Sequence, residues 1–396
     1  MAKLIFWLGP SLEQWNFATA LEQGIGGSET AAIHLAREFA KLGHEIVVYA
    51  NLDSVFKYSV KVRIVDGERV DEGGVLRAIP YQGMPEHEPC DIFVSSRQPE
   101  ARRKCLPHCK TSWLWVHDLH CGPDWDNLIA TDYDNILCLS SFAREKFLVY
   151  YPGLDPAKVL LTSNAVDFSL FDQSIFTDPD VLGCHPMLLD RLRPGEQQAA
   201  YRDGISPLRV TYSSSPDRGL EKLLDLWPRI CELAPLAPPP ELHVYYGFEN
   251  WRKSAKLHGS AADVVRADWL TYRLSTTPGV FNHGRAGQAE VARSFLRSQL
   301  WLYPTDFLET SCITAMEAQA AGCRIVATRC GALPETVPGA RFVEGPTSAP
   351  DYDDRFLRVV EKTLQERADY VPAHVRTWSD VAKQWDEWIR EIGLGG

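Results

Sequence analysis

Short apolar runs that alternate with helical stretches constrain the fold of this chain most strongly. Leu4–Leu8 is a run of five apolar residues, and Glu45–Tyr49 is a second, largely apolar run. Strands that are buried on both faces of a sheet have this composition. Between the two runs, apolar residues recur at helical spacing, at Ala32, Leu35, Ala36 and Phe39. The start of the chain therefore predicts a βαβ unit, the building block of a parallel sheet.

The same alternation continues in two series along the 396 residues. The predicted strands of the first series are Asp91–Ser95, Ser112–Val116, Asn135–Leu139 and Val159–Leu161. Those of the second series are Leu208–Tyr212, Leu242–Tyr246, Leu300–Tyr303, Ile325–Thr328 and Arg341–Val343. Regularity fades in between, where proline, glycine and charged residues are scattered. We expect an α/β protein of two Rossmann-like domains, whose ligands lie at the carboxyl ends of parallel strands.

The domain boundaries follow from this pattern. The first domain is predicted over residues 1–168, a linker or insertion over 169–206, and the second domain over 207–377. The remaining segment, 378–396, contains apolar residues at helical spacing between Trp378 and Ile392. We expect this helix to pack back on the first domain.

Composition excludes several classes of protein. The chain has 41 Lys and Arg against 52 Asp and Glu, and a net charge of −11 argues against binding to duplex nucleic acid. A hydrophobic content of 45% excludes general disorder. The start of the chain lacks the apolar stretch of a signal peptide, and no run is long enough for a membrane helix. We expect a cytoplasmic protein without a membrane span, with peripheral membrane contact left open, and we interpret most of its ten cysteines as buried free thiols.

A glycine-rich loop precedes the first helix. Gly24-x-Gly26-x-x-Glu29 is not a dinucleotide-binding motif, because Glu29 replaces the third small residue and the glycines lie far beyond the strand. Small residues at a helix N-terminus still allow an anion to approach the backbone N–H groups. We therefore consider Gly26 and Gly27 as binding residues, with Ser28 as the helix N-cap. The alternative is that the two glycines only permit positive φ angles before the helix.

The most informative segment runs from Tyr303 to Ala318. A strand is followed by Glu309, then by a helix predicted to begin near Ser311 and to end at Gly322, with Glu317 inside it. Eight helical residues span about 12 Å, whereas the carboxylates of a glycosidase lie roughly 5–9.5 Å apart. The two glutamates therefore fit separate parts of one extended ligand, with a phosphate at the helix N-terminus between them, as in a nucleotide sugar. The alternative is an amphipathic helix with an ordinary exposed glutamate.

These motifs together resemble the family-4 retaining glycosyltransferases with the GT-B fold. The resemblance rests on Glu309-x7-Glu317-Ala318, Gly331-Ala332-Leu333-Pro334-Glu335, Gly26-Gly27-Ser28-Glu29, Gly43-His44-Glu45, Ser140-Ser141-Phe142 and Asn164-Ala165-Val166-Asp167. It extends over nearly the whole chain and implies two Rossmann-like domains that face a central cleft.

The resemblance also implies roles for individual residues. Glu317 would hold the ribose hydroxyls of the nucleotide, and Glu309 would hold hydroxyls of the donor sugar. The backbone amides after Glu309 would contact the sugar and the diphosphate, namely those of Thr310, Ser311, Cys312 and Ile313. Many family members have Gly-Phe-Gly where this chain has Thr310-Ser311-Cys312, so the sugar that the donor carries stays open.

The family neutralises the leaving diphosphate with an arginine and a lysine after the first strand of the second domain. Arg218-Gly219 matches the usual Lys-Gly, but the usual arginine position holds Ser213. The candidates to compensate are Lys222, Arg285 and the hydroxyls of Ser213 and Ser214. The alternative for Arg218 is a solvated charge at the start of a helix. His283, on a predicted loop, is expected near the base.

His117 follows the strand Ser112–Val116 at its carboxyl end. The resemblance places it against the donor sugar near the reacting carbon, and the alternative is a loop histidine packed on Trp113 or Trp115. His120 is the weaker candidate in the same loop. Nearby cysteines and histidines do not have zinc-site spacing, and the strings Asp132-Tyr133-Asp134 and Asp351-Tyr352-Asp353 do not follow buried strands. We predict no metal and no cofactor.

The function expected from the resemblance is metal-independent, retaining transfer of a hexose from a nucleotide-diphosphate sugar. UDP-sugar is favoured as donor and GDP-mannose comes second, and the acceptor is a hydroxyl of a glycan, a glycolipid or another molecule. His117, Arg218 and Glu309 are the residues assigned to catalysis. The alternatives are a nucleotide-sugar epimerase of the same fold and a non-catalytic sugar-nucleotide binding protein.

Overall fold

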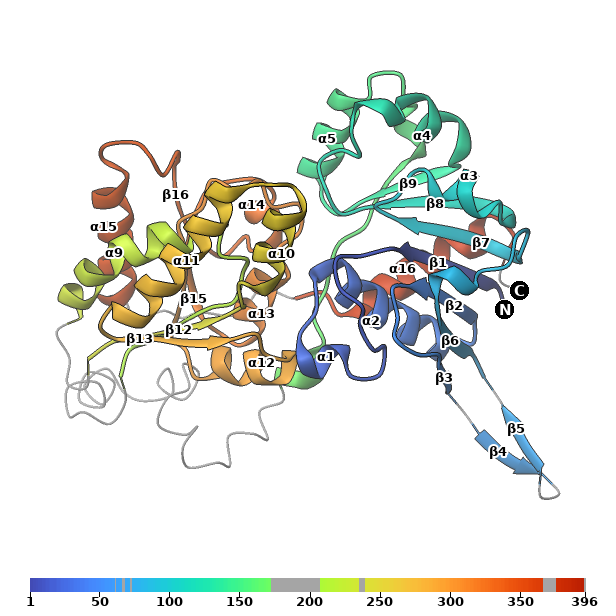
Figure 1. The fold of residues 1–396 in the computed structure, drawn as a ribbon, viewed down its shortest axis with the longest axis horizontal. Helices are drawn as coiled ribbons and strands as arrows, with labels where there is room; N and C mark the ends of the chain where they lie inside the picture. Colours follow the sequence, from blue (N-terminus) through green and yellow to red (C-terminus); the bar gives the residue numbers. More distant parts are fainter. Residues whose placement is uncertain are drawn as a thin grey trace. The chain divides into compact units, whose positions relative to one another are not determined.

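The computed structural model describes residues 1–60, 62–65, 68–71, 73–171, 207–234, 239–365 and 375–394 (Figure 1). It divides into two compact units. Unit 1 comprises residues 1–21, 25–165 and 376–396, and unit 2 comprises residues 22–24 and 166–375. Most of the predicted linker, residues 172–206, lies outside the described residues.

Unit 1 is built on a sheet with the strand order β10-β9-β8-β7-β1-β2-β6-β3. Its strands are β1 (Lys3–Gly9), β2 (Glu45–Ala50), β3 (Phe56–Ser59), β6 (Val75–Pro80), β7 (Pro89–Ser96), β8 (His108–Val116), β9 (Asn135–Cys138) and β10 (Val159–Leu161). All neighbouring strands are parallel except β3, which runs antiparallel to β6. A separate antiparallel pair is formed by β4 (Val62–Val65) and β5 (Glu68–Asp71).

The helices of unit 1 cap and cover this sheet. They are α1 (Ala20–Gln23), which ends in unit 2, α2 (Gly27–Lys41), α3 (Ala101–Cys105), α4 (Asp126–Asp132), α5 (Ser141–Tyr150) and α16 (Trp378–Glu391). Single 3₁₀ turns lie at Tyr81–Gly83, Pro123–Trp125 and Pro156–Lys158. The side chain of Ser140 caps α5 by accepting a hydrogen bond from the amide of Ala143 over 3.1 Å, which gives the Ser-Ser-Phe motif a structural purpose.

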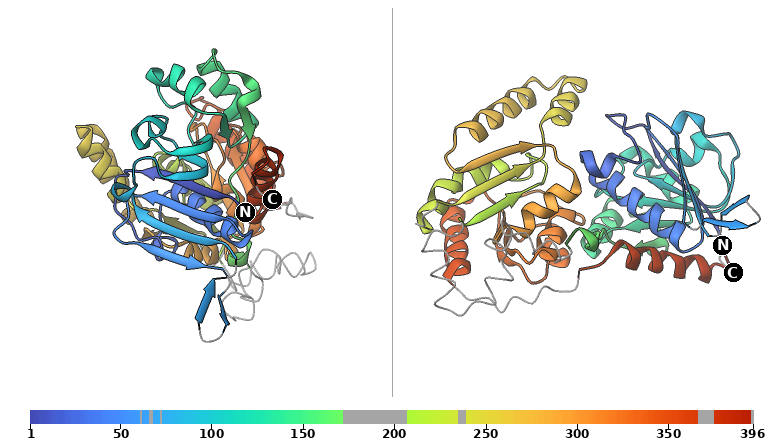
Figure 2. Two further views of the ribbon diagram at one scale, coloured as in Figure 1. Left: turned by 90° about the vertical axis from the view of Figure 1, so that its right-hand side faces the viewer. Right: turned by 90° about the horizontal axis from the view of Figure 1, so that it is seen from below.

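The C-terminal helix α16 completes the core of unit 1 (Figure 2). Trp385 stacks on Phe6 of β1 with ring centroids 6.4 Å apart, and its indole nitrogen donates to the Thr162 hydroxyl over 2.8 Å. Asp386 accepts a hydrogen bond from the buried ring of His44 over 3.0 Å. The Gly43-His44 turn is thus fixed by a helix that follows it by more than 300 residues.

Unit 2 is built on a parallel sheet with the strand order β13-β12-β11-β14-β15-β16. Its strands are β11 (Arg209–Tyr212), β12 (Glu241–Tyr245), β13 (Val280–Gly284), β14 (Leu300–Tyr303), β15 (Arg324–Thr328) and β16 (Arg341–Val343). Its helices are α9 (Leu220–Leu233), α10 (Glu249–Leu257), α11 (Ala261–Thr276), α12 (Gln288–Leu296), α13 (Ile313–Ala320), α14 (Leu333–Thr336) and α15 (Tyr352–Gln365), and a 3₁₀ turn, η4, spans Phe168–Phe171.

The predicted fold class is confirmed: the structure is mixed α/β with two parallel sheets. Two details of the sequence analysis are wrong. His283 lies within β13 and not on a loop, because an edge strand of Val, Phe, Asn, His and Gly lacks the apolar run of a central strand. The strands β3 to β6 were not predicted; β3 is the edge strand of the sheet, where Lys57 and Tyr58 are exposed, and β6 lies next to it. No helix in the described part of the chain is long and apolar enough to cross a membrane.

Candidate active site

Glu309 lies at the end of the loop that follows β14, and only 4% of its surface is exposed. Its Oε1 accepts a hydrogen bond from the Tyr303 hydroxyl over 2.7 Å. Nη1 of Arg218 lies 3.3 Å from each of the two carboxylate oxygens. A buried carboxylate needs such partners, because desolvation without them is costly. The structure therefore brings together two of the three residues that the sequence assigned to catalysis.

Arg218 is held by an aromatic ring as well as by this carboxylate. Its guanidinium carbon lies 4.0 Å from the ring centroid of Phe307, a cation–π contact. Burial is the largest influence and lowers the pKa of Arg218, but Glu309, together with the neighbouring Tyr303 and Asp217, raises it overall. The Nε of Arg218 is buried and has no hydrogen-bond partner among the described residues. Arg218 is thus a fixed cation with one N–H donor to spare.

Two glycines allow this arrangement to form. Gly219, with φ +102°, precedes α9, and a Cβ there would lie 2.4 Å from the carbonyl oxygen of Pro304. Gly331, with φ +56°, would place a Cβ 2.5 Å from the amide nitrogen of Glu309. Only glycine accepts both the positive φ and the close approach. Gly219 therefore brings Arg218 against the loop after β14, and Gly331 supports the backbone of Glu309.

The helix α13 follows this loop, with Cys312 as its N-cap residue. Cys312 has no side-chain oxygen with which to cap the first-turn amides, and its sulfur contacts the amide of Ala315. The helix begins at Ile313, later than predicted, and the residues from Glu309 to Cys312 are not helical. The 12 Å spacing that the sequence analysis assigned to the two glutamates therefore does not apply, since half of the interval is loop.

Glu317 lies within α13 and is half-buried. Desolvation by burial raises its pKa to about 8. Near neutral pH its carboxyl group is therefore largely protonated in the unliganded protein, unlike an ordinary surface glutamate. A ligand that donates hydrogen bonds to this carboxyl group would favour its charged, carboxylate form.

Ser213 and Ser214 directly follow β11. Ser214 is buried, and the Oγ of Ser213 is a buried atom without a hydrogen-bond partner among the described residues. Buried hydroxyls are normally paired, so a ligand oxygen is a natural acceptor for this one. Ser213 thus provides a neutral hydroxyl donor at the position where the family that this sequence resembles has an arginine.

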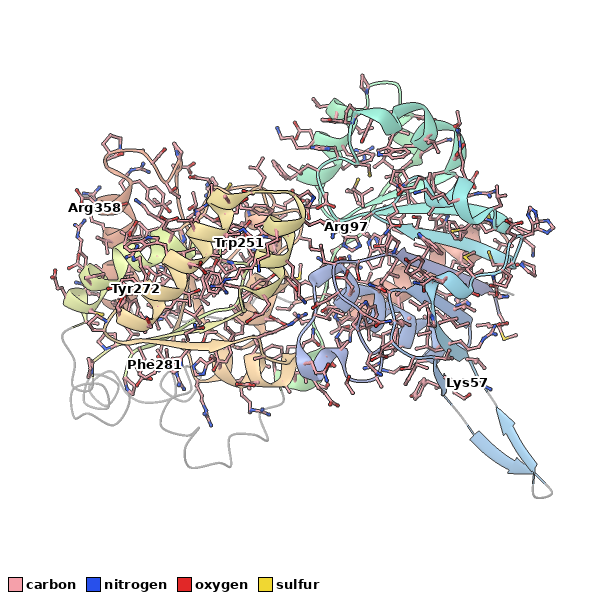
Figure 3. The ribbon with its side chains drawn as sticks, in the orientation of Figure 1. Lys57, Arg97, Trp251, Tyr272, Phe281 and Arg358 are labelled. Carbon is pink, nitrogen blue, oxygen red and sulfur yellow. The ribbon has the colours of Figure 1, made fainter. Side chains whose placement is uncertain are left out.

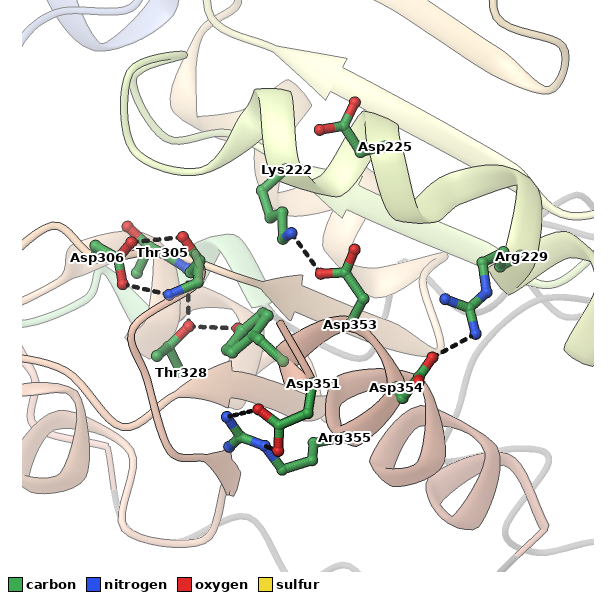
Figure 4. Close-up of polar contacts among 12 residues, drawn as sticks. Lys222, Asp225, Arg229, Thr305, Asp306, Thr328, Asp351, Asp353, Asp354 and Arg355 are labelled. Carbon is green, nitrogen blue, oxygen red and sulfur yellow. Dashed lines mark hydrogen bonds and ion pairs between the residues drawn. The ribbon is translucent and has the colours of Figure 1, made fainter. Parts of the chain in front are cut away.

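The compensating cations that the sequence offered have other neighbours. Lys222 forms an ion pair with Asp353 of α15 (Figure 4), and its Nζ lies 5.7 Å from the ring centroid of Tyr352. Arg285 borders Gly24 and Gly247. The structure thus pairs Lys222 with a carboxylate other than Glu309.

His283 belongs to a stack of rings on β12 and β13 of unit 2. Its ring lies 4.3 Å from that of Tyr245, and its Nε2 lies 2.8 Å from Nδ1 of His243. Burial lowers the pKa of His283, so its ring is neutral at physiological pH. Phe281 stacks on the outer side of His243 and is exposed (Figure 3). The stack lies on the edge strand β13 and its neighbour β12, with His243 and Tyr245 buried, whereas the Arg218–Glu309 pair follows the two middle strands, β11 and β14.

In unit 1 the glycine loop ends at the N-terminus of α2. The helix begins at Gly27, and its N-cap residue is Gly26, not Ser28. Neither Gly26 nor Gly27 has a positive φ; Gly24 has one, at +79°. The alternative that the pair serves only to allow positive φ is therefore wrong. A Cβ at Gly26 would lie 2.5 Å from Oε2 of Glu29, the end of a side chain that can move aside.

His117 follows β8 and packs on Trp115, with ring centroids 4.4 Å apart. Burial, and secondarily the charge of Arg97, lowers its pKa to about 3. The ring is therefore neutral across the physiological range and can exchange hydrogen bonds with hydroxyls without carrying charge. His120 lies in the same loop and stacks on Tyr150 at 4.3 Å.

Arg97 was missed by the sequence analysis (Figure 3). It follows β7 with φ +67°, and its Nε donates to Asp118 over 2.8 Å while its Nη1 lies 3.4 Å from the Ser28 hydroxyl. It thus connects the start of α2 to the residue after His117. The sequence signal that could have found it is its position at the carboxyl end of β7, the strand next to the one that His117 follows.

Carboxylates of both acidic strings form ion pairs with basic side chains. Asp132 pairs with Arg103, Asp351 with Arg355, and Asp353 with Lys222. Within the described ranges, no group of three or more His, Cys, Asp or Glu side chains could hold a metal ion.

No protein-family model matches the chain. It is 25% identical over 261 residues to a subunit of the phosphatidylinositol N-acetylglucosaminyltransferase of Arabidopsis thaliana, and the match covers 64% of this chain and 48% of that protein. The chain thus matches about half the length of this curated relative.

Solved structures match over nearly the whole chain. Sucrose-phosphate synthase from Thermosynechococcus elongatus has a TM-score of 0.61 at 13% identity and covers 99% of both chains. Anabaena HepE in complex with UDP-glucose has a TM-score of 0.57 at 14% identity, covering 97% of this chain and 94% of that one. At such identities the likeness shows the fold. The chain therefore has the GT-B fold of these solved glycosyltransferases, and part of its sequence is similar to a subunit of a sugar transferase.

Proposed function

We propose that the protein is a retaining glycosyltransferase of family 4 that transfers a hexose from a UDP-sugar to a hydroxyl acceptor without a metal ion. The observation that carries the proposal is the Arg218–Glu309 pair, with contacts of 3.3 Å and a buried Nε that has no partner in the described residues. A diphosphate supplies the oxygen acceptors that this N–H lacks. HepE, of the same fold, is solved with UDP and with UDP-glucose.

In the proposed complex Arg218 changes partners. Its guanidinium gives up part of its contact with Glu309 and donates hydrogen bonds to the diphosphate instead. Glu309 then accepts hydrogen bonds from sugar hydroxyls in place of those from Arg218. The Ser213 hydroxyl and the amides from Thr310 to Ile313 supply neutral donors to the same charge. Lys222 is not required for this arrangement, because Asp353 already neutralises it.

The proposed reaction keeps the anomeric configuration without a protein nucleophile. Glu309 is the buried carboxylate beside Arg218, and in the proposed complex its oxygens accept hydrogen bonds from Tyr303 and from sugar hydroxyls, so it does not serve as a nucleophile. We propose that the acceptor hydroxyl attacks on the face that the diphosphate leaves. The sugar–phosphate bond breaks, the new glycosidic bond forms, and the leaving phosphate oxygen takes the acceptor proton. His117 is neutral and would contact a hydroxyl of the sugar.

The proposal is tested by a thermal-shift screen of UDP, GDP and ADP and their hexose conjugates, followed by product analysis. UDP-N-acetylglucosamine and phosphatidylinositol belong in the panels because the curated relative belongs to a phosphatidylinositol N-acetylglucosaminyltransferase. We expect stabilisation by one nucleotide above the others and a glycosylated product. An isomerised donor without acceptor would indicate an epimerase, and tight nucleotide binding without turnover would indicate a binding protein.

The affinity for a UDP-sugar should rise with pH and level off near pH 8. The pKa of Glu317 is raised to about 8 in the unliganded protein, and two ribose hydroxyls donate best to its carboxylate form. Each pH unit below that value reduces the carboxylate fraction about tenfold, so affinity should fall by up to about tenfold per unit. Calorimetric titration at several pH values measures this slope. Glu317→Gln should bind weakly at every pH; a mutant that retained the wild-type slope would contradict the ribose role.

Turnover should persist in excess EDTA and should not rise with manganese or magnesium. The reason is that Arg218 and neutral donors are proposed to stabilise the leaving diphosphate, which is the task of a metal ion in other transferases. The measurement is the initial rate before and after chelation, with metal-free buffer as the control. Activity that vanished in EDTA and returned with manganese would show that the diphosphate depends on a metal ion.

A further inference from the structure

Two cysteines face each other at the start of neighbouring strands in unit 1. Cys90 of β7 and Cys109 of β8 are directly paired in the parallel register, and the Cys90 thiol is hydrogen-bonded to the Cys109 sulfur. Both are free thiols. Neither belongs to the candidate active site: roughly 3.3 Å of rise per strand residue places His117 about 26 Å along β8 from Cys109.

The pairing meets the Cα–Cα distance requirement of a disulfide. Adjacent strands lie about 4.7–4.9 Å apart, and bridged cysteines have Cα atoms about 4.4–6.8 Å apart. The two side chains also point to the same side of the sheet, since they share a hydrogen bond. Cys109 is half-buried and Cys90 is 9% exposed, so a reagent in solution meets Cys109 first.

The two thiols differ in acidity. The hydrogen bond from Cys90 lowers the pKa of Cys109 to about 7, burial opposes this shift, and the charge of Arg102 adds to it. The same hydrogen bond, together with burial, raises the pKa of Cys90. The thiolate is the nucleophile in disulfide exchange, so Cys109 is the attacking sulfur and Cys90 the resolving one.

We propose that Cys90 and Cys109 form a dithiol modification site that small disulfides, such as oxidised glutathione, convert to an internal disulfide. The Cys109 thiolate attacks one sulfur of oxidised glutathione, forms a mixed disulfide and releases one glutathione thiolate. Cys90 loses its proton and attacks the Cys109 sulfur, which releases the second. Two protein thiols are oxidised and one glutathione disulfide is reduced to two thiols.

The experiment treats the folded, full chain with oxidised glutathione under native conditions. The linked cysteines are then located by tryptic digestion and mass mapping. Trypsin yields one peptide, 78–97, that contains Cys90, and one, 105–110, that contains both Cys105 and Cys109. Cys105 is buried in the same hydrophobic cluster, so the decisive variant is Cys105→Ser. Cys231→Ser, a half-buried thiol of unit 2, is the matched control.

We expect the two peptides to be linked, with loss of two hydrogens, in the wild type, in Cys105→Ser and in Cys231→Ser. The link should be absent in Cys90→Ala and Cys109→Ser, and Cys109 of Cys90→Ala should gain one glutathione. A link that survives Cys109→Ser but not Cys105→Ser would overturn the proposal, as would a wild-type Cys90 that stays fully alkylated by iodoacetamide after denaturation. The link must be lost in both Cys90→Ala and Cys109→Ser, so misfolding of one of these variants does not decide the outcome.

Discussion

Arg218→Met is expected to reduce turnover by about a hundredfold or more, the usual effect of removing one group that stabilises a developing charge. The substitution should also lower the free energy of unfolding of unit 2. Breaking a buried ion pair costs about 3–5 kcal/mol because the remaining charge is buried and unpaired. Arg218 is 37% exposed and Glu309 5% by side chain, so solvent screening reduces this to about 2–3 kcal/mol. Initial rates and urea unfolding measure the two effects.

A matched control lies on the helix that follows Arg218. Arg229 of α9 pairs with Asp354 over 2.8 Å, but both side chains are more than half exposed (Figure 4). Arg229→Met should change stability by less than about 1 kcal/mol and leave turnover unchanged. Wild-type turnover in Arg218→Met, assayed well below its unfolding midpoint, would mean that another cation serves the diphosphate.

Gly331→Ala is expected to destabilise unit 2 by about 2–4 kcal/mol, because a left-handed backbone and an overpacked contact add their costs. The residue has φ +56°, and a Cβ would lie 2.5 Å from the amide nitrogen and 2.6 Å from the carbonyl oxygen of Glu309. That carbonyl also accepts the amide of Ala332 over 2.7 Å. The backbone of Glu309 must therefore move, and turnover should fall together with stability. Urea unfolding and initial rates again provide the measurement.

Two other glycines separate the causes of this effect. Gly259 has φ +68° and no atom within 4 Å of the position that a Cβ would take, and Gly339 also has open space but no positive φ. Gly259→Ala should show only the conformational cost, about 1 kcal/mol, and Gly339→Ala should be close to neutral. Equal losses of unfolding free energy in Gly331→Ala and Gly259→Ala would show that the close contact with Glu309 adds nothing to the destabilisation.

The candidate site could be predicted where one segment carries it. Glu309, the N-terminus of α13 and Glu317 lie within nine residues, so the sequence alone shows that they must be close together in space. Arg218 was assigned from its motif, but its pairing with Glu309 bridges 91 positions. Arg97 was missed because its place at the carboxyl end of a strand was its one local signal; its contacts with Ser28 and Asp118 depend on other elements that bring these residues to it.

The sequence by itself determined the strands that are buried on both faces, because an uninterrupted apolar run has no other stable place in a parallel α/β sheet. Leu300–Tyr303 was predicted with its bounds as the structure has them. Tertiary structure decided what depends on partners far along the chain. Examples are the edge strand that holds His283, the ion pair that occupies Lys222, and the opposed thiols of Cys90 and Cys109. Local sequence encodes burial and helix period, whereas a side chain's charge state and partner are set only when distant elements enclose it.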